Sequence, residues 1–159
     1  KKAREGVRVK FINENIANFP IGHRYYKSMK KAGVEVIRFT GIRHLIGDFL
    51  SKLNYRNHRK IVVIDGKIGY TGGMNINDHY FRQWRDTHLR IEGDAVASLQ
   101  LIFLNSWVIS GGKREERYPF YFPDAAPQAD GKLVQIISDE PGMNFHPIET
   151  SYQWGLFRS

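Results

Sequence analysis

The residues with the clearest chemical potential lie in one stretch, HRKIVVIDGKIGYTGGMN, which covers residues 58–75. His58 and Lys60 are two apart on what reads as a strand, so alternation places both side chains on one face. A Gly-Gly pair and Asn75 follow the next strand, where missing side chains let a ligand approach the backbone. One imidazole, one ammonium and one amide suit a phosphate group, whose oxygens Lys60 and Asn75 would hold. His58 would then be free to attack phosphorus or to move a proton.

A hairpin must position these groups. Asp65-Gly66 between KIVVI and KIGYTG is a strong two-residue turn signal. Both faces of the first strand carry apolar residues, so we expect it to be central in its sheet and covered on both sides. A lysine in such a place is costly unless an anion meets it.

The rest of the chain predicts helices and strands in alternation. A helix–glycine–strand unit occurs twice, as KKAREGVRVKF with Gly6 and as HRYYKSMKKAGVEVIRF with Gly33. Further strands are expected at 87–93 and 132–138, and a long apolar helix at 94–110 begins with an N-cap aspartate. This alternation favours an α/β fold with helices packed on a sheet that has parallel neighbours.

The composition of the 159-residue chain narrows the possible chemistry. There is no cysteine, which excludes disulfides, thiolate metal sites and thiol catalysis. The formal net charge of +8 predicts attraction to nucleic acid, anionic lipid headgroups or phosphate esters, without choosing among them. No apolar run approaches the ~20 residues that span a bilayer.

The spacing His-x-Lys-x4-Asp-x6-Gly-Gly-x-Asn resembles the signature of the phospholipase D superfamily. Together with WRDTHLRIEGDAV and KKAREGVRVKF, it is similar to the first of the two catalytic halves of bacterial cardiolipin synthase. The resemblance implies an α-β-α sandwich, with a mixed sheet, helices on both faces and a central hairpin that carries the site. It divides the chain into a catalytic half at 1–110, a linker or surface excursion at 111–131, and the start of a second half at 132–159.

The resemblance also implies a role for each matching residue. The family's histidine forms a phosphohistidine, and a histidine from a second copy of the motif is the general acid; no metal or cofactor is required. Asp65, at the turn, would be structural. The expected site residues are His58, Lys60, Asp65 and Asp86 for catalysis, and Lys60, Gly72, Gly73 and Asn75 for phosphate binding.

Asp86 is the candidate for orienting the histidine. A nucleophilic imidazole needs its second ring nitrogen fixed, and a carboxylate on a neighbouring strand would do this. The alternative is that Asp86 merely pairs with Arg85 or Arg90. Trp84 is expected in the core. Gly73 stands where many family members have serine, so one hydroxyl donor is missing.

Only one copy of the motif occurs, so a complete site needs a second half from a longer chain or from a twofold partner. The resemblance implies a phosphatidyltransferase: one phosphatidylglycerol gives its phosphatidyl group to His58, and the hydroxyl of a second accepts it. It implies location at the bacterial cell membrane, this stretch itself being soluble. One alternative is a homodimeric nuclease or phosphodiesterase acting on nucleic acid. Another is an inert substrate-binding half.

Overall fold

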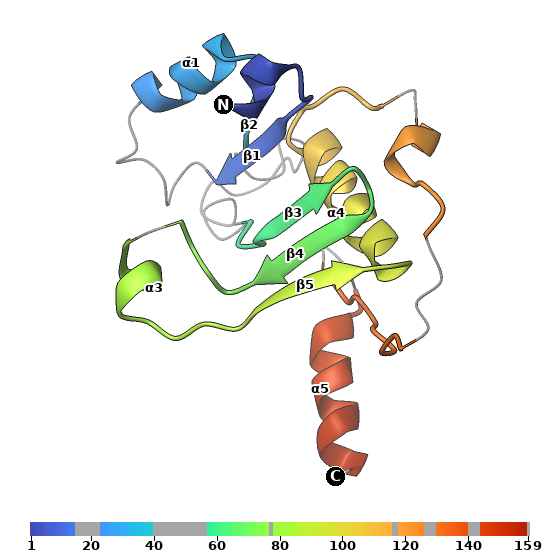
Figure 1. Ribbon diagram of the computed structural model, residues 1–159. Helices are drawn as coiled ribbons and strands as arrows, with labels where there is room; N and C mark the ends of the chain where they lie inside the picture. The colour runs from blue at the N-terminus through green and yellow to red at the C-terminus, as the bar shows by residue number, and fades with distance from the viewer. Residues whose placement is uncertain are drawn as a thin grey trace. The chain divides into compact units, whose positions relative to one another are not determined.

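The computed structural model describes seven stretches of the chain, which belong to two compact units. The described stretches are residues 1–14, 23–39, 57–76, 78–115, 118–125, 130–139 and 144–158. The first unit combines Lys1–Arg59 with Leu104–Glu115, and the second combines Lys60–Phe103 with Glu116–Ser159. Figure 1 shows the strands and helices of each unit.

The first unit contains a parallel pair of strands, each preceded by a helical segment. Its elements are η1 (Lys2–Glu5), β1 (Lys10–Glu14), α1 (His23–Lys31) and β2 (Glu35–Phe39). Gly6 and Gly33 separate helix from strand with φ values of 90° and 91°. Glycine adopts this left-handed conformation without steric cost. The expected helix–glycine–strand unit, used twice, is confirmed.

A cluster of charges joins the strands of this unit. The ammonium of Lys10 on β1 lies 2.8 Å from a carboxylate oxygen of Glu35 on β2 and 2.6 Å from one of Glu115. Arg8 bonds the same two carboxylates, at 3.0 and 2.9 Å. Only 8% of the Lys10 side chain is exposed, and its ammonium lies 4.1 Å from the centre of the Trp107 ring. Every charge in the cluster therefore has an opposite partner.

The second unit is built on an antiparallel sheet in the order β3–β4–β5. Its strands are β3 (Ile61–Ile64), β4 (Ile68–Gly72) and β5 (His88–Glu92); its helical segments are α3 (Asp78–Arg82), η2 (Tyr118–Tyr121) and α5 (Pro147–Arg158), and α4 (Ala95–Ile109) begins in it. The expected mixed α/β architecture, with parallel strands, antiparallel strands and helices, is confirmed.

The start of α4 packs on one face of this sheet (Figure 1). Val96 and Leu99 are 0% and 2% exposed, and with Ile91 of β5 they form the core of the unit. A Cβ atom on Gly69 of β4 would lie 2.7 Å from Cδ1 of Leu99. The glycine therefore lets the helix approach the sheet closely.

β3 lies at the edge of its sheet, whereas the sequence predicted a central strand covered on both sides. Ile61 and Val63 pack against the core under α4. On the other face, Val62 and Ile64 are 53% and 45% exposed. Two apolar faces indicated burial on both, but within the described residues β3 pairs with β4 alone.

Residues 132–138 were also expected to form a strand, and the structure assigns them to none. Ile136 packs against the core, while Leu133 is fully exposed. The segment is rich in apolar residues, but it has no ladder partner in the described part of the chain, and pairing is what defines a strand.

Among the described residues, the two longest helices are α4 and α5. None of the helices within the described stretches is long and apolar enough to cross a membrane, since α4 has 15 residues. The second helix, α5, leaves several large apolar side chains mostly exposed, namely Tyr152, Trp154, Leu156 and Phe157.

Candidate active site

The hairpin turn sets the geometry of the candidate site. Asp65 and Gly66 have φ values of 52° and 67°, as the tight primed turn requires, and the N–H of Lys67 donates to the carbonyl of Ile64 at 3.0 Å. Asp65 and Lys60 flank opposite ends of β3, five residues or roughly 17 Å apart in an extended strand. Asp65 therefore shapes the turn and does not share a phosphate pocket with Lys60.

A second contact explains why glycine follows Asp65. A Cβ atom on Gly66 would lie 2.5 Å from Cδ of Pro123 and 2.6 Å from the carbonyl oxygen of Tyr121. The segment at and after η2 therefore packs against the hairpin turn and leaves no room for a side chain there.

Lys60 lies at the opposite end of the hairpin, in a row with Gly72 and His88. Ile61 pairs with Thr71, so continuing the register by one residue brings Lys60 beside Gly72. Gly72 is in turn paired with His88 on β5. A Cβ atom on Gly72 would lie 2.5 Å from the carbonyl oxygen of Thr87, so β5 lies close against the middle of this row.

Burial and a nearby carboxylate act in opposite directions on the pKa of Lys60. Burial lowers the pKa of its ammonium below the usual 10.5, and the charge of Asp86 opposes this only in part. A partly desolvated ammonium gains more from an incoming anion than one that is fully hydrated.

Asp86 is fixed by the backbone of the Gly-Gly pair. The N–H of Gly73 donates to Oδ1 of Asp86 at 3.2 Å, and a Cβ on Gly73 would lie 2.7 Å from Oδ2. Gly73 therefore makes room for the carboxylate whose charge raises the pKa of Lys60. Among the described residues Asp86 forms no ion pair with Arg85 or Arg90, and Arg90 pairs instead with Glu92.

His88 of β5 packs beside Gly72 in this region. Its Nδ1 atom is buried without a hydrogen-bond partner, and a Cβ on Gly72 would lie 2.5 Å from it. The imidazole thus occupies the space that the glycine leaves. The pairing of Gly72 with His88 sets this contact, and it depends on the register of β4 and β5.

Asn75 lies just beyond the sheet, beside a surface cluster of aromatic rings. Its amide nitrogen donates to the hydroxyl of Tyr80 at 3.2 Å, and the Tyr80 ring meets the Trp84 ring edge-on, 5.0 Å between centroids. Trp84 is 59% exposed, so its expected place in the core is wrong. It packs against the rings of His79 and Tyr80, which also lie outside the core.

His58 belongs to the first unit and is exposed. Immediately before it, the side-chain oxygen of Asn57 accepts a hydrogen bond from the N–H of Arg59 at 3.2 Å, which fixes the local backbone. The structure thus gathers Lys60, Gly72, Gly73 and Asp86 at one end of the second unit's sheet, with His58 two residues before Lys60 in the sequence. In the described residues no three metal-ligating side chains come together.

Comparisons with known proteins bear on this arrangement. Residues 1–107 match the family model described as cardiolipin synthase, PLD-like domain. The chain is 40% identical to the cardiolipin synthase of Geobacillus kaustophilus over 96% of its own length and 31% of the relative's, and 38% identical to that of Halalkalibacterium halodurans over 89% and 29%. It is 41% identical to cardiolipin synthase 2 of Bacillus cereus over 96% and 30%. The chain thus spans about three tenths of the length of these relatives, and no solved structure matches it.

Proposed function

The chain belongs to the family of cardiolipin synthase phospholipase D-like domains, and on this premise we propose that it is one catalytic half of a phosphatidyltransferase. The observation that carries the proposal is the match over residues 1–107, which contain the whole motif from His58 to Asn75. The proposed boundary of the catalytic half at residue 110 lies close to the end of that match.

In the first step, a ring nitrogen of His58 attacks the phosphorus of a phosphatidylglycerol molecule. The phosphorus–oxygen bond to the terminal glycerol breaks, and this glycerol leaves with a proton from a general acid. In the second step, the hydroxyl of another phosphatidylglycerol attacks phosphorus, and the phosphorus–nitrogen bond breaks. The hydroxyl proton passes to the same residue, now acting as base, and the product is cardiolipin.

The other side chains hold the phosphate and orient the nucleophile. Lys60 carries a desolvated charge that developing negative charge on the phosphoryl oxygens would compensate. The amide of Asn75 would hold a second oxygen, and Gly72 and Gly73 would contribute to phosphate binding indirectly, because His88 and Asp86 occupy the space beside them. Asp86, fixed by the Gly73 N–H, would orient the imidazole.

The general acid comes from outside this motif. We propose a second catalytic half, from the same longer polypeptide or from a twofold partner, as its source. The substrate would be an anionic phospholipid at a bacterial membrane surface. The relatives, more than three times as long as the matched region, leave room for a second half in one polypeptide.

The test measures the reaction of His58 with phosphorus under conditions that do not require the general acid. A phosphodiester with a 4-nitrophenolate leaving group and a labelled phosphorus needs no protonation of the leaving group, so capture of label depends on His58. We expect alkali-stable, acid-labile label on His58, none in His58→Ala, and full labelling in His146→Ala, a matched exposed histidine. Label on another residue, or turnover by His58→Ala, would contradict the mechanism. Offering phosphatidylglycerol or a DNA strand as acceptor to the labelled protein then separates lipid transfer from nuclease chemistry.

A further inference from the structure

Charge is divided very unequally between the two units. The described residues of the first unit carry 13 Lys and Arg against four Asp and Glu. Those of the second unit carry seven Lys and Arg against nine Asp and Glu. The basic character of the chain therefore resides in the first unit, although the phosphate-holding Lys60 belongs to the second.

Much of this excess lies on α1, whose nine residues include no acid. Arg24, Lys27, Lys30 and Lys31 are all exposed, and none of the four makes an ion pair in the described part of the chain. Their spacing of three and four residues places them on the solvent side of the helix, while Tyr26 faces inward and is 6% exposed.

Helix stability does not explain this pattern. Cations in the last turn, such as Lys30 and Lys31, interact favourably with the helix dipole. Arg24 lies in the first turn, where a cation is unfavourable and an acidic residue is the usual choice. The cations of α1 thus suit a partner outside the chain.

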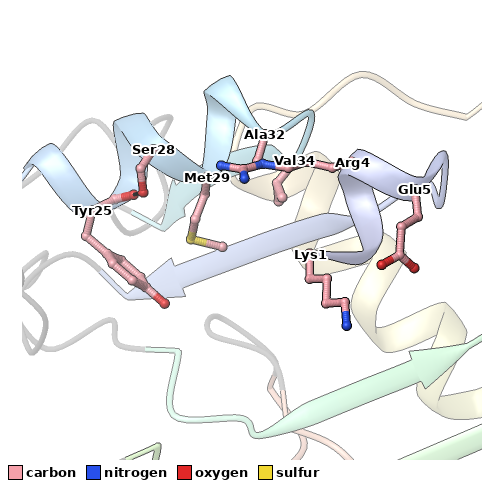
Figure 2. Close-up of a pocket in the computed structure, with 8 residues that line it drawn as sticks. All are labelled: Lys1, Arg4, Glu5, Tyr25, Ser28, Met29, Ala32 and Val34. Carbon is pink, nitrogen blue, oxygen red and sulfur yellow. Dashed lines mark hydrogen bonds between the residues drawn. The ribbon is translucent and has the colours of Figure 1, made fainter.

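A hollow beside α1 indicates the chemistry of that partner. It measures about 640 Å³ and lies between α1 and η1 (Figure 2). Figure 2 shows Lys1, Arg4 and Glu5 on the η1 side, and Glu5 forms an ion pair with Lys2. The hollow is also lined by apolar groups, namely Met29, Ala32 and Val34, and by Tyr25, which is 57% exposed. Cations beside apolar surface match a phospholipid, which carries apolar chains next to its phosphate headgroup, whereas the outer surface of duplex DNA is mainly charged phosphate backbone.

We propose that this α1 surface, formed by the exposed faces of α1 and η1, docks on an anionic phospholipid bilayer. The inference deepens the proposed function, since a phosphatidyl-transferring site must meet its lipid at a membrane surface. Each lysine or arginine near an anionic bilayer strengthens binding about fivefold. The exposed tyrosine is of the type that is enriched at the interface between headgroups and water.

The test neutralises charge without disturbing the helix. Lys27, Lys30 and Lys31 are replaced together by glutamine, whose helix propensity is close to that of lysine. The matched control carries glutamine at three exposed cations of the second unit, Lys67, Lys132 and Arg158. Both variants lose the same net charge, and circular dichroism checks that both remain folded.

Binding is measured by cosedimentation with vesicles of phosphatidylcholine containing 30% phosphatidylglycerol. We expect the α1 variant to lose about 10²-fold in partition coefficient and the control less than a third of that loss on a logarithmic scale. Binding should also weaken as salt rises and vanish on pure phosphatidylcholine. Equal losses in the two variants, or none in the α1 variant, would overturn the proposal. So would tighter binding of a 20-base-pair DNA duplex that depends on the same lysines.

Labelling of His58 by the water-soluble phosphodiester separates the two proposals. Loss of vesicle binding with labelling intact in the α1 variant supports the docking surface. If the unaltered chain is not labelled, the proposed mechanism is contradicted, and the vesicle result still tests the docking surface. If the unaltered chain is labelled but does not bind anionic vesicles, only the proposed docking surface is contradicted.

Discussion

Lys10 in the first unit and Lys60 in the second are both partly withdrawn from water, but their ammonium groups have different charged neighbours. Lys10 has carboxylate oxygens of Glu35 and Glu115 within 2.8 Å and lies over the Trp107 ring. For Lys60, burial lowers the pKa and Asp86 restores only part of the loss. Lys10 thus lies between carboxylates of its own unit, whereas the charge that raises the pKa of Lys60 is that of Asp86, beside the Gly-Gly pair.

The glycines of the two units differ in a parallel way. In the first unit, Gly6 and Gly33 supply a left-handed backbone where a helix turns into a strand. In the second unit, Gly69, Gly72 and Gly73 instead make room for neighbouring side chains. Substitution therefore tests backbone conformation in one unit and the layout of the candidate site in the other.

Replacing Lys60 by methionine should have the largest effect. Removing one preorganised charge from a phosphate site costs about 10²- to 10³-fold in rate. We expect that loss in the rate of label capture at His58, with the free energy of unfolding unchanged or higher, because burial disfavours the charged form of Lys60. A capture rate within a factor of three of the unaltered chain would assign Lys60 no part in phosphate binding.

Replacing Lys10 by methionine should give the opposite result, a loss of stability with capture per folded molecule unchanged. It leaves Glu35 and Glu115 sharing Arg8, which pairs with both carboxylates. Breaking such a cluster costs about 2 kcal/mol, at the low end for buried pairs since Glu35 is partly exposed. Urea unfolding at pH 7 measures the loss, and Lys10→Arg is the control that keeps the charge.

The same cluster predicts a pH dependence. Burial raises the pKa of Glu35, but hydrogen bonds from Lys10 and Arg8, together with their charges, outweigh it and leave the pKa below 4.5. A depressed carboxyl pKa contributes stability that is present above pH 4.5 and is lost as the pH falls through the lowered value. The difference between the unaltered chain and Lys10→Met should therefore shrink below pH 4.5. A difference that is constant from pH 7 to pH 3 would contradict this account.

Local sequence signals predicted the elements of both units well. The Asp65-Gly66 pair gave the hairpin, since only a few residue types accept positive φ at both turn positions. Gly6 and Gly33 gave the two helix ends for the same reason. These signals act between neighbours in the sequence, so one sequence suffices to interpret them.

Long-range pairing could not be predicted in this way. The edge position of β3 and the absence of a strand at 132–138 depend on which strands find partners, which alternation does not encode. The place of His88 beside Gly72 likewise follows from the register of β4 and β5. Trp84 was expected in the core from its residue type, but it is exposed and packs against the Tyr80 ring on the surface.

Replacing Gly69 by alanine should have a smaller effect, about 1 kcal/mol in the free energy of unfolding. The new Cβ would stand 2.7 Å from Cδ1 of Leu99, and overpacking costs about 1–3 kcal/mol, offset by the lower chain entropy of alanine. Combining it with Leu99→Ala, which alone should cost about 3 kcal/mol, tests the contact directly. The double variant should be more stable than the sum of the single losses predicts. Strict additivity would place the strain elsewhere.

Replacing Gly73 by alanine should change stability least, by about 0.5 kcal/mol or less, because the site is exposed and its φ is not left-handed. The added Cβ would displace the Asp86 carboxylate, since it would stand 2.7 Å from Oδ2. Lys60 would then lose part of the attraction that opposes burial, and its pKa should fall further below 10.5. NMR titration of the Lys60 side chain measures this shift, with Gly69→Ala as a control that leaves Asp86 untouched. An unchanged pKa would mean that the fit between Gly73 and Asp86 does not affect the protonation of Lys60.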